Sequence, residues 1–277
     1  MMHTEWSTNN IFQKIKSKIL NHPYCILYYA NDTTFDLILP KCTNDNYVIV
    51  QAQDKQHIHS INYNYTAISS LFITHSELDS IFSTNTDLII FNHSNLSSTK
   101  KEDLSILAKN TKNAYIINFD RSSDSILPNT ININYPIPKY NMSSTKEKDV
   151  LIFNLNNDNM INNIAKAIKK QNINIDIITS INGDIDSLYH TLSNYKVILD
   201  LSSRINILCS LMCGCNIVTN IDLNNHLEKK YVYQFTKFED IFMTIKKALQ
   251  EPRPDISDLI ETYDSNNLNN TLAELSK

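Results

Sequence analysis

The sequence is short of glycine, of arginine and of long apolar runs. Its 277 residues include only 2 glycines, Gly183 and Gly214. They lie too far apart to form a G-x-G-x-x-G loop or a Walker loop, which hold phosphate through glycine backbone. Arginine occurs 3 times against 22 lysines, while isoleucine and asparagine reach 39 and 37, a bias toward residues with A/T-rich codons. The composition indicates an AT-rich bacterial, viral or mobile genome and excludes a glycine-cradled phosphate site.

Charge and apolar content narrow the class of protein. The formal net charge of -4 argues against a protein that mainly binds nucleic acid, although this net charge is compatible with a local basic groove. With 42% hydrophobic and 19% charged residues, the chain can build a core. No apolar run approaches the ~18 residues of a membrane span, and the N-terminal segment is too polar for a signal peptide. We therefore expect a soluble, cytoplasmic protein without a membrane span.

The cysteines are odd in number and have no CxxC spacing. They are Cys25, Cys42, Cys209, Cys213 and Cys215. Cys209 and Cys213 share a helical face and could supply two of four zinc ligands, but no second pair is spaced to complete the site. His57 and His59 likewise have no third ligand nearby. We expect buried thiols and no metal.

Short β-branched runs alternate with amphipathic segments, which is typical of parallel sheets. In the first half we expect strands at 25–30, 47–51, 71–74, 87–92 and 114–119, with helices at 8–20 and 98–111. In the second half we expect strands at 150–155, 173–179, 196–201, 216–219 and 231–235, with helices at 159–170, 184–193, 206–213 and 237–250. The pattern predicts an α/β fold of two Rossmann-like, doubly wound domains that face a cleft.

Two prolines and a polar, charged run mark an interdomain linker at 135–149. The predicted domains are therefore residues 1–145 and 146–254. Residues 255–277 follow a Glu-Pro-Arg-Pro segment and carry spaced leucines, so we expect one or two helices that pack back on the body.

Ligands of open parallel sheets bind beyond the carboxyl ends of the strands, so the loops there are the candidate sites. The strand at 196–201 is followed by Ser202, Ser203, Arg204 and Asn206. A serine cap, the N–H groups of a first helical turn and a forked guanidinium all favour an anion. We expect these four residues to form a diphosphate site without glycine. The alternative is that Arg204 is only a solvated residue of the first turn.

Three candidates follow strands of the first domain. Asp32 follows the first strand and His93 ends the strand at 87–92, where either residue could serve as a general base. The alternative for both is an ordinary turn or loop residue. Arg121 follows the last strand and is a second candidate for anion binding.

Residues 196–220 resemble the nucleotide-binding half of GT-B glycosyltransferases, in which a strand ends in a serine loop, a helix ends in a small-residue glycine turn and a short apolar strand follows. Gly214 matches the family's glycine and is expected to end the helix in a left-handed conformation. Residues 87–94 look like the family's strand that ends in an exposed serine near the acceptor. The segment after residue 254 is similar to the helix that crosses back to the first domain.

The resemblance implies a metal-independent enzyme that moves a sugar from a nucleoside diphosphate sugar, by preference a UDP-sugar, to an acceptor hydroxyl. Residues 202–204, Asn206 and Arg121 would hold the donor, and His93 or Asp32 would be the acceptor-side base. The acceptors range from cell-surface glycans to hydroxymethylated bases of phage DNA. The acidic residue and the basic pair with which the family binds its donor are absent. One alternative is therefore a non-catalytic binding or scaffold protein, and another is a different two-domain nucleotide-sugar enzyme such as an epimerase.

Overall fold

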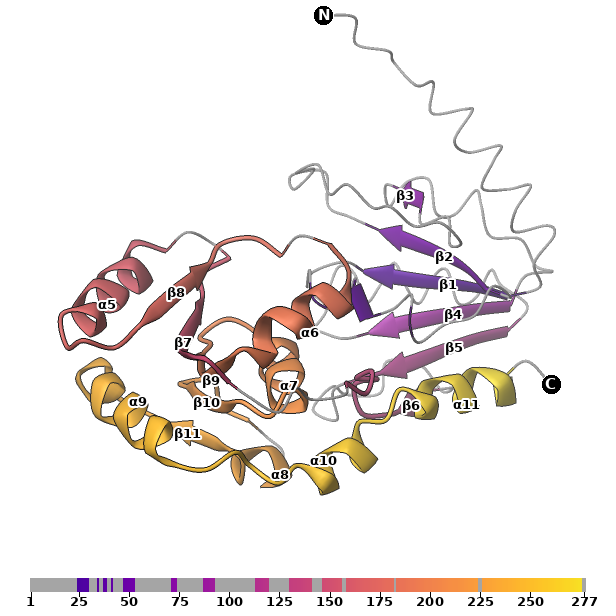
Figure 1. Cartoon of the computed structure of the whole chain (residues 1–277). Helices are drawn as coiled ribbons and strands as arrows, with labels where there is room; N and C mark the ends of the chain where they lie inside the picture. Colours follow the sequence, from indigo (N-terminus) through magenta and orange to yellow (C-terminus); the bar gives the residue numbers. More distant parts are fainter. Residues whose placement is uncertain are drawn as a thin grey trace, which may run out of the picture. The chain divides into compact units, whose positions relative to one another are not determined.

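The computed structural model has an α/β architecture with two parallel sheets (Figure 1). It describes residues 24–29, 34, 37–38, 41, 47–52, 71–73, 87–92, 113–119, 130–140, 146–155, 158–181, 183–223 and 226–275. The chain divides into two compact units. The first is Met1–Asn31, Leu39–Tyr135 and Asn266–Lys277, and the second is Asp32–Ile38 and Pro136–Ser265. The predicted domain bounds and the cleft stay predictions.

The described part of the first unit carries one parallel sheet in the order β3-β2-β1-β4-β5-β6. Its strands are β1 (Tyr24–Tyr29), β2 (Tyr47–Ala52), β3 (Leu71–Ile73), β4 (Asp87–Asn92), β5 (Asn113–Asn118) and β6 (Thr130–Asn132). The strand order reverses between β1 and β4, as in a doubly wound fold. All five predicted strands are confirmed, and β6 was missed because its sequence, Thr-Ile-Asn, has a single apolar residue between two polar ones. The helices predicted at 8–20 and 98–111 lie outside the described residues.

The second unit carries a parallel sheet in the order β11-β10-β9-β7-β8. Its strands are β7 (Lys148–Phe153), β8 (Ile175–Ile178), β9 (Tyr195–Leu199), β10 (Asn216–Thr219) and β11 (Val232–Gln234). They confirm the five predicted strands with shifts of one or two residues at their ends. From β7 the chain adds β8 on one side of the strand, and it then returns to add β9 on the other side. The strand order therefore reverses between β7 and β9, which lie side by side. This pair is the point where a ligand is expected in such a sheet.

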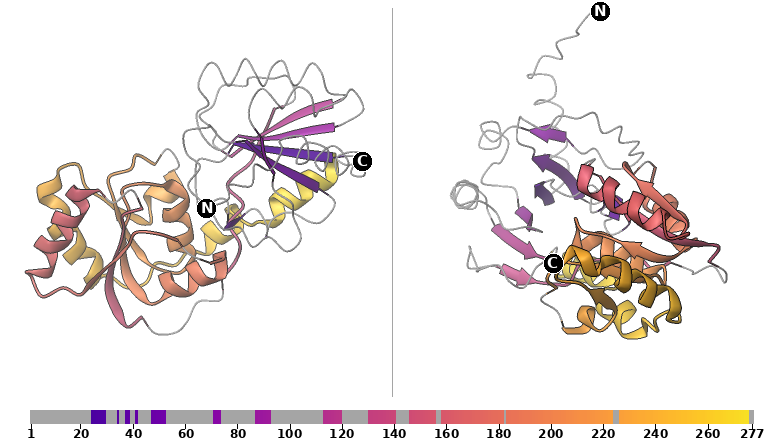
Figure 2. Two further views of the ribbon diagram at one scale, coloured as in Figure 1. Left: turned by 90° about the horizontal axis from the view of Figure 1, so that it is seen from above. Right: turned by 90° about the vertical axis from the view of Figure 1, so that its left-hand side faces the viewer.

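Helices cover both faces of this second sheet (Figures 1 and 2). They are α5 (Asn159–Lys169), α6 (Ile185–Ser193), α7 (Arg204–Met212), α8 (His226–Lys229), α9 (Ile241–Gln250) and α10 (Ser257–Thr262), with a 3-10 turn η2 (Phe238–Asp240). Helices α5 and α9 pack on the face that carries Val150, Ile152 and Val197, and together they bury a continuous apolar core. Helices α6 and α7 lie on the opposite face. Alternation of side chains along each strand gives both helical layers an apolar surface to cover.

Local sequence explains where α5 and α6 begin. Asp158 and Asp184 precede α5 and α6, and their carboxylates accept hydrogen bonds from Met160 N at 2.7 Å and Ser187 N at 2.9 Å. Such aspartate caps satisfy N–H groups that the helix itself cannot pair. The helix predicted at 206–213 begins two residues earlier, and the helix predicted at 237–250 divides into η2 and α9.

The C-terminal segment forms helices, as predicted. Helix α10 belongs to the second unit, and α11 (Asn266–Leu275), which buries Leu268 and Leu272, belongs to the first. Residue Ile137, in the predicted linker, is extended and donates its N–H to Tyr263 O at 2.9 Å. Among the helices in the described ranges, none combines the length and the apolar composition needed to cross a bilayer.

Candidate functional site

Two buried polar side chains stand at the carboxyl edge of the second sheet, where the strand order reverses. Asn154 follows β7 and is 1% exposed, and Asp200 follows β9 and is 0% exposed. The Oδ1 of Asn154 accepts from Asp158 N at 2.7 Å, and its Nδ2 donates to Asp158 O and to Asn162 Oδ1, both at 3.1 Å. Asn154 therefore holds Asp158, the residue that precedes α5.

Asp200 shapes the loop that leads into α7. Its Oδ1 accepts from Ser202 N at 2.7 Å, from Ser202 Oγ at 2.7 Å and from Ser203 N at 3.2 Å. This is the local turn in which an aspartate binds the backbone two residues further on. The N–H groups of Ser202 and Ser203, which precede the first turn of α7, thus hold a carboxylate of the protein itself.

The burial of Asp200 makes its charge costly. Burial raises the pKa of Asp200 from its ordinary value of 3.8 to about 6, while hydrogen bonding from Ser202, from Ser203 and from the side chain of Asn206 acts in the opposite direction. Among the described residues, Asp200 Oδ2, Asn206 Nδ2 and Ser210 Oγ are buried atoms without a hydrogen bond of ordinary geometry. Buried polar atoms are normally paired, so this cluster is an exception that needs an explanation. The charge on the loop is expected to change near pH 6.

Helix α7 starts without the predicted serine cap. Ser203 occupies the cap position with extended backbone, but its side chain makes no capping hydrogen bond, and the hydroxyl of Ser202 donates to Asp200. The predicted end of the helix is confirmed, because Gly214 is left-handed with φ +66°.

Arg204 is held by a buried carboxylate. Its Nη2 lies 2.6 Å from Glu228 Oε1 and its Nε lies 2.9 Å from Glu228 Oε2. The Glu228 side chain is 0% exposed and that of Arg204 is 20% exposed, so the alternative of a solvated first-turn arginine is wrong. The hydroxyl of Tyr263 donates to the same carboxylate. Burial acts to lower the pKa of Arg204, but Glu228 outweighs it and the pKa lies above its ordinary value.

Asn206, in the first turn of α7, faces the protein interior. Its Oδ1 accepts a hydrogen bond from the hydroxyl of Thr34, and both residues are buried. Thr34 belongs to the segment Asp32–Ile38, which is part of the second unit although it follows β1 in the chain. Thr34 therefore covers the side chain of Asn206 at the beginning of α7.

The structure brings Ser202, Ser203, Arg204 and Asn206 together at one edge of the second sheet. Asp32, His93 and Arg121 lie outside the described residues, as do His57, His59 and Cys42, and their roles stay predictions. In the second unit, the thiols of Cys209, Cys213 and Cys215 are buried, as predicted. Within the described ranges, no three His, Cys, Asp or Glu side chains gather as a metal site would require.

Sequence reasoning missed Asp200 and Glu228. For Asp200 there was a local signal, since an aspartate at the end of an apolar strand followed by two serines favours a turn of this kind. For Glu228 there was none, because it meets Arg204 across 24 residues of chain.

Solved structures share this architecture. The chain matches the glycosyltransferase of kitacinnamycin with a TM-score of 0.53 at 8% identity, over 91% of this chain and 98% of the other. It matches UDP-GlcNAc 2-epimerase from Methanocaldococcus jannaschii with a TM-score of 0.50 at 10% identity, over 91% and 99% of the two chains. The chain has a GT-B-like fold.

The GT-B-like fold confirms the resemblance drawn from residues 196–220. No family model matches the sequence, and no curated protein matches it either. At these identities the likeness shows the fold alone. The chemistry depends on the residues at the carboxyl edge of β7 and β9.

Proposed function

We propose that the protein is a glycosyltransferase that binds a nucleoside diphosphate sugar at the carboxyl edge of its second sheet and moves the sugar to an acceptor hydroxyl. The observation that carries the proposal is the start of α7 directly after β9, beside the reversal of strand order at β7. A helix that begins at such a point directs its N–H groups and its positive dipole end toward the ligand.

In this proposal the donor's diphosphate binds the loop of Ser202 and Ser203 and the side chain of Arg204, while Asn206, which is 1% exposed, supports the first turn of α7 from within. Ser202 is exposed, and it is the member of the set that a ligand reaches first. Hydrogen bonds from the loop and the charge of Arg204 would stabilise negative charge on the leaving diphosphate without a metal. The donor class is a UDP-sugar. Arg121 is the second anion-binding residue of the proposal.

On the acceptor side, His93 or Asp32 is the proposed base that takes the proton of the acceptor hydroxyl. The acceptor is a cell-surface glycan or a hydroxymethylated base of phage DNA. Transfer of labelled sugar to hydroxymethylated DNA, with unmodified DNA as the control, separates these two acceptors.

Thermal shift and calorimetric titration with UDP, GDP, TDP and their sugars test the donor site. We expect one nucleotide series to stabilise the protein, and Ser202→Asp to weaken its binding roughly tenfold at low salt, because a carboxylate then faces the diphosphate. Asn163→Asp adds the same charge on the exposed side of α5 and is the matched control. A protein that no nucleotide stabilises is not a glycosyltransferase of this kind. Binding that Ser202→Asp leaves unchanged contradicts the site.

A second candidate is a non-catalytic protein that keeps the fold as a binding module. The observation that favours it is that both anion-binding features are engaged internally, the loop N–H groups by Asp200 and the guanidinium of Arg204 by Glu228. A diphosphate then has to compete with carboxylates that are already in place. Nucleotide binding without release of UDP from a UDP-sugar in the presence of any acceptor would support this candidate over the enzyme.

A further inference from the structure

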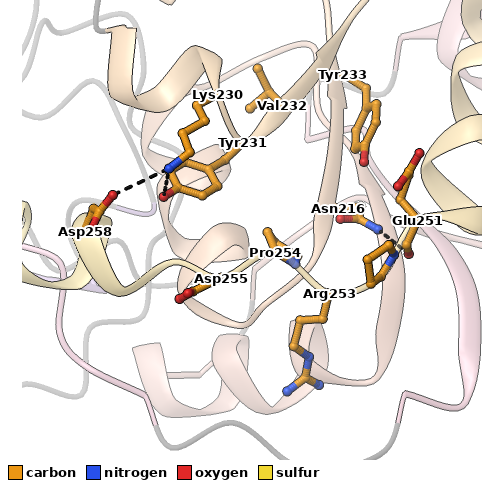
Figure 3. A pocket seen from close by; sticks show the side chains of 11 residues that line it. Asn216, Lys230, Tyr231, Val232, Tyr233, Glu251, Arg253, Pro254, Asp255 and Asp258 are labelled. Carbon is orange, nitrogen blue, oxygen red and sulfur yellow. Dashed lines mark hydrogen bonds and ion pairs between the residues drawn. The ribbon is translucent and has the colours of Figure 1, made fainter.

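A cavity of about 430 Å³ opens at the amino edge of β10 and β11, the opposite edge of the sheet from Asp200 (Figure 3). Its walls come from the first residues of both strands, from the Glu251–Asp255 segment that follows α9, and from α10. Cavities of ~300 to 1,000 Å³ hold small organic ligands. We propose that this cavity binds a neutral carbohydrate, one or two sugar rings in size.

One wall presents a fixed hydrogen-bond acceptor. Asn216, the first residue of β10, is 5% exposed. Its Nδ2 donates to Ala248 O at 2.8 Å and to Glu251 O at 3.2 Å, which sets the orientation of the amide. The amide oxygen is therefore turned away from Glu251, toward the side on which Tyr231 lies (Figure 3). A preset amide oxygen suits a ligand hydroxyl, because it accepts without having to be reoriented.

The facing wall presents donors. Lys230 Nζ lies 3.2 Å from the hydroxyl of Tyr231 and 3.6 Å from Asp258 Oδ2. Tyr231 is 8% exposed, so its ring is fixed in the wall of the cavity. The hydroxyl of Tyr233 points toward Asn216 (Figure 3). The ammonium and the two phenol groups supply the donors that complement the oxygen of Asn216.

The charges around the cavity exclude a phosphate as its preferred ligand. Glu251, Asp255 and Asp258 outnumber the cations Lys230 and Arg253 in the wall. Arg253 also points away from Asn216 and Tyr231 (Figure 3). An anion would meet more negative than positive charge at close range, which is unfavourable.

The apolar part of the wall is small and flat. Pro252 and Pro254 line the cavity together with Val232 and offer ring surfaces without a deep hydrophobic pocket. A lipid tail would leave its area exposed in such a site, whereas a sugar ring presents a C–H face to such surfaces and hydroxyls to the polar groups. Polar atoms of both kinds together with flat apolar surfaces favour a neutral, hydroxyl-rich ligand.

The full-length protein is titrated with glucose, galactose and N-acetylglucosamine, with saturation-transfer NMR and calorimetry as the measurements. We expect saturable binding of at least one sugar, and Tyr233→Phe and Lys230→Met each to weaken it about fivefold or more, the usual effect of one lost hydrogen bond. Tyr140→Phe and Lys246→Met are the matched controls outside the cavity and should bind as the wild type does. Thermal melts check that each variant is folded.

The proposal is wrong if none of the three sugars binds saturably, or if both cavity variants bind as tightly as the wild type. Inorganic phosphate that competes with the bound sugar at similar concentrations would also overturn the assignment to a neutral ligand. The titration is independent of the donor site, because it is run without nucleotide. Its failure therefore leaves the proposed glycosyltransferase activity untouched, and failure of nucleotide binding leaves this site untouched.

Discussion

Arg204 at the start of α7 and Glu228 in α8 form a buried ion pair, with Nη2 and Oε1 2.6 Å apart and a second hydrogen bond from Nε. The pair joins two helices that lie 24 residues apart in the chain. It also means that the positive charge at the mouth of the candidate donor site is compensated within the protein. The same carboxylate accepts from Tyr263, so three segments of the second unit meet there.

Removal of the Glu228 charge is expected to destabilise the protein. Glu228→Gln leaves the guanidinium of Arg204 largely buried beside a neutral amide, and such loss of one partner lowers the free energy of unfolding by about 3 kcal/mol. Urea denaturation at pH 7 measures the change. Glu261→Gln removes an exposed carboxylate and should cost less than about 0.5 kcal/mol. Equal stability of the two variants would show that the ion pair contributes nothing.

The raised pKa of Asp200 predicts that the free energy of unfolding falls as the pH rises. A salt-bridged carboxylate, whose pKa is lowered, has the opposite effect. The pKa of Asp200, about 6 in the folded protein, exceeds the ordinary value of 3.8, so the folded state binds the proton more tightly. The wild type should therefore lose about 3 kcal/mol of stability relative to Asp200→Asn as the pH rises from 3 to 7, and little more above that. Unfolding free energies of both proteins at several pH values give this difference.

The exposed Asp222 provides the control for that series. Asp222→Asn should change the free energy of unfolding at pH 7 by less than about 0.5 kcal/mol, because its side chain is 83% exposed. A difference between the wild type and Asp200→Asn that does not change with pH would contradict the raised pKa of Asp200.

The fold could be predicted from the sequence because each buried strand of the second sheet is a short apolar run between polar turns. Burial of Val150, Ile152 and Val197 is the physical counterpart of that pattern. The site was accessible only in part. Arg204 was found from its place after a strand, but its partner Glu228 is distant in the chain, and no local pattern reports a pairing of that kind. The contact of Thr34 with Asn206 was inaccessible for the same reason, since it spans 172 residues.

Substitution tests whether the two glycines are required by their backbone conformations. Gly183 and Gly214 are both left-handed, with φ +96° and +66°, and asparagine takes a third such position at Asn172. Gly214→Ala should lower the free energy of unfolding by about 1 kcal/mol. Gly183→Ala should cost about 2 kcal/mol, because its Cβ would also lie 3.1 Å from Ser187 Oγ. Thermal or urea denaturation ranks the two variants.

The asparagine variants of both positions are the controls, since asparagine adopts this conformation more readily than alanine. Gly214→Asn should recover part of the lost stability. Gly183→Asn should recover less, because its Cβ makes the same close contact with Ser187. If all four variants were equally stable, neither backbone conformation would need glycine.

The contact between Thr34 and Asn206 is expected to stabilise the first turn of α7. Thr34→Val keeps the shape of the side chain but leaves the buried oxygen of Asn206 without this donor, which should cost about 1 to 2 kcal/mol. Thr34→Ser retains the hydroxyl and should cost less. A double-mutant cycle of Thr34→Val with Asn206→Leu should give a coupling energy of about 1 kcal/mol in urea denaturation. A coupling energy of zero would mean that the two side chains do not interact in solution, and that the first turn of α7 lacks this cover.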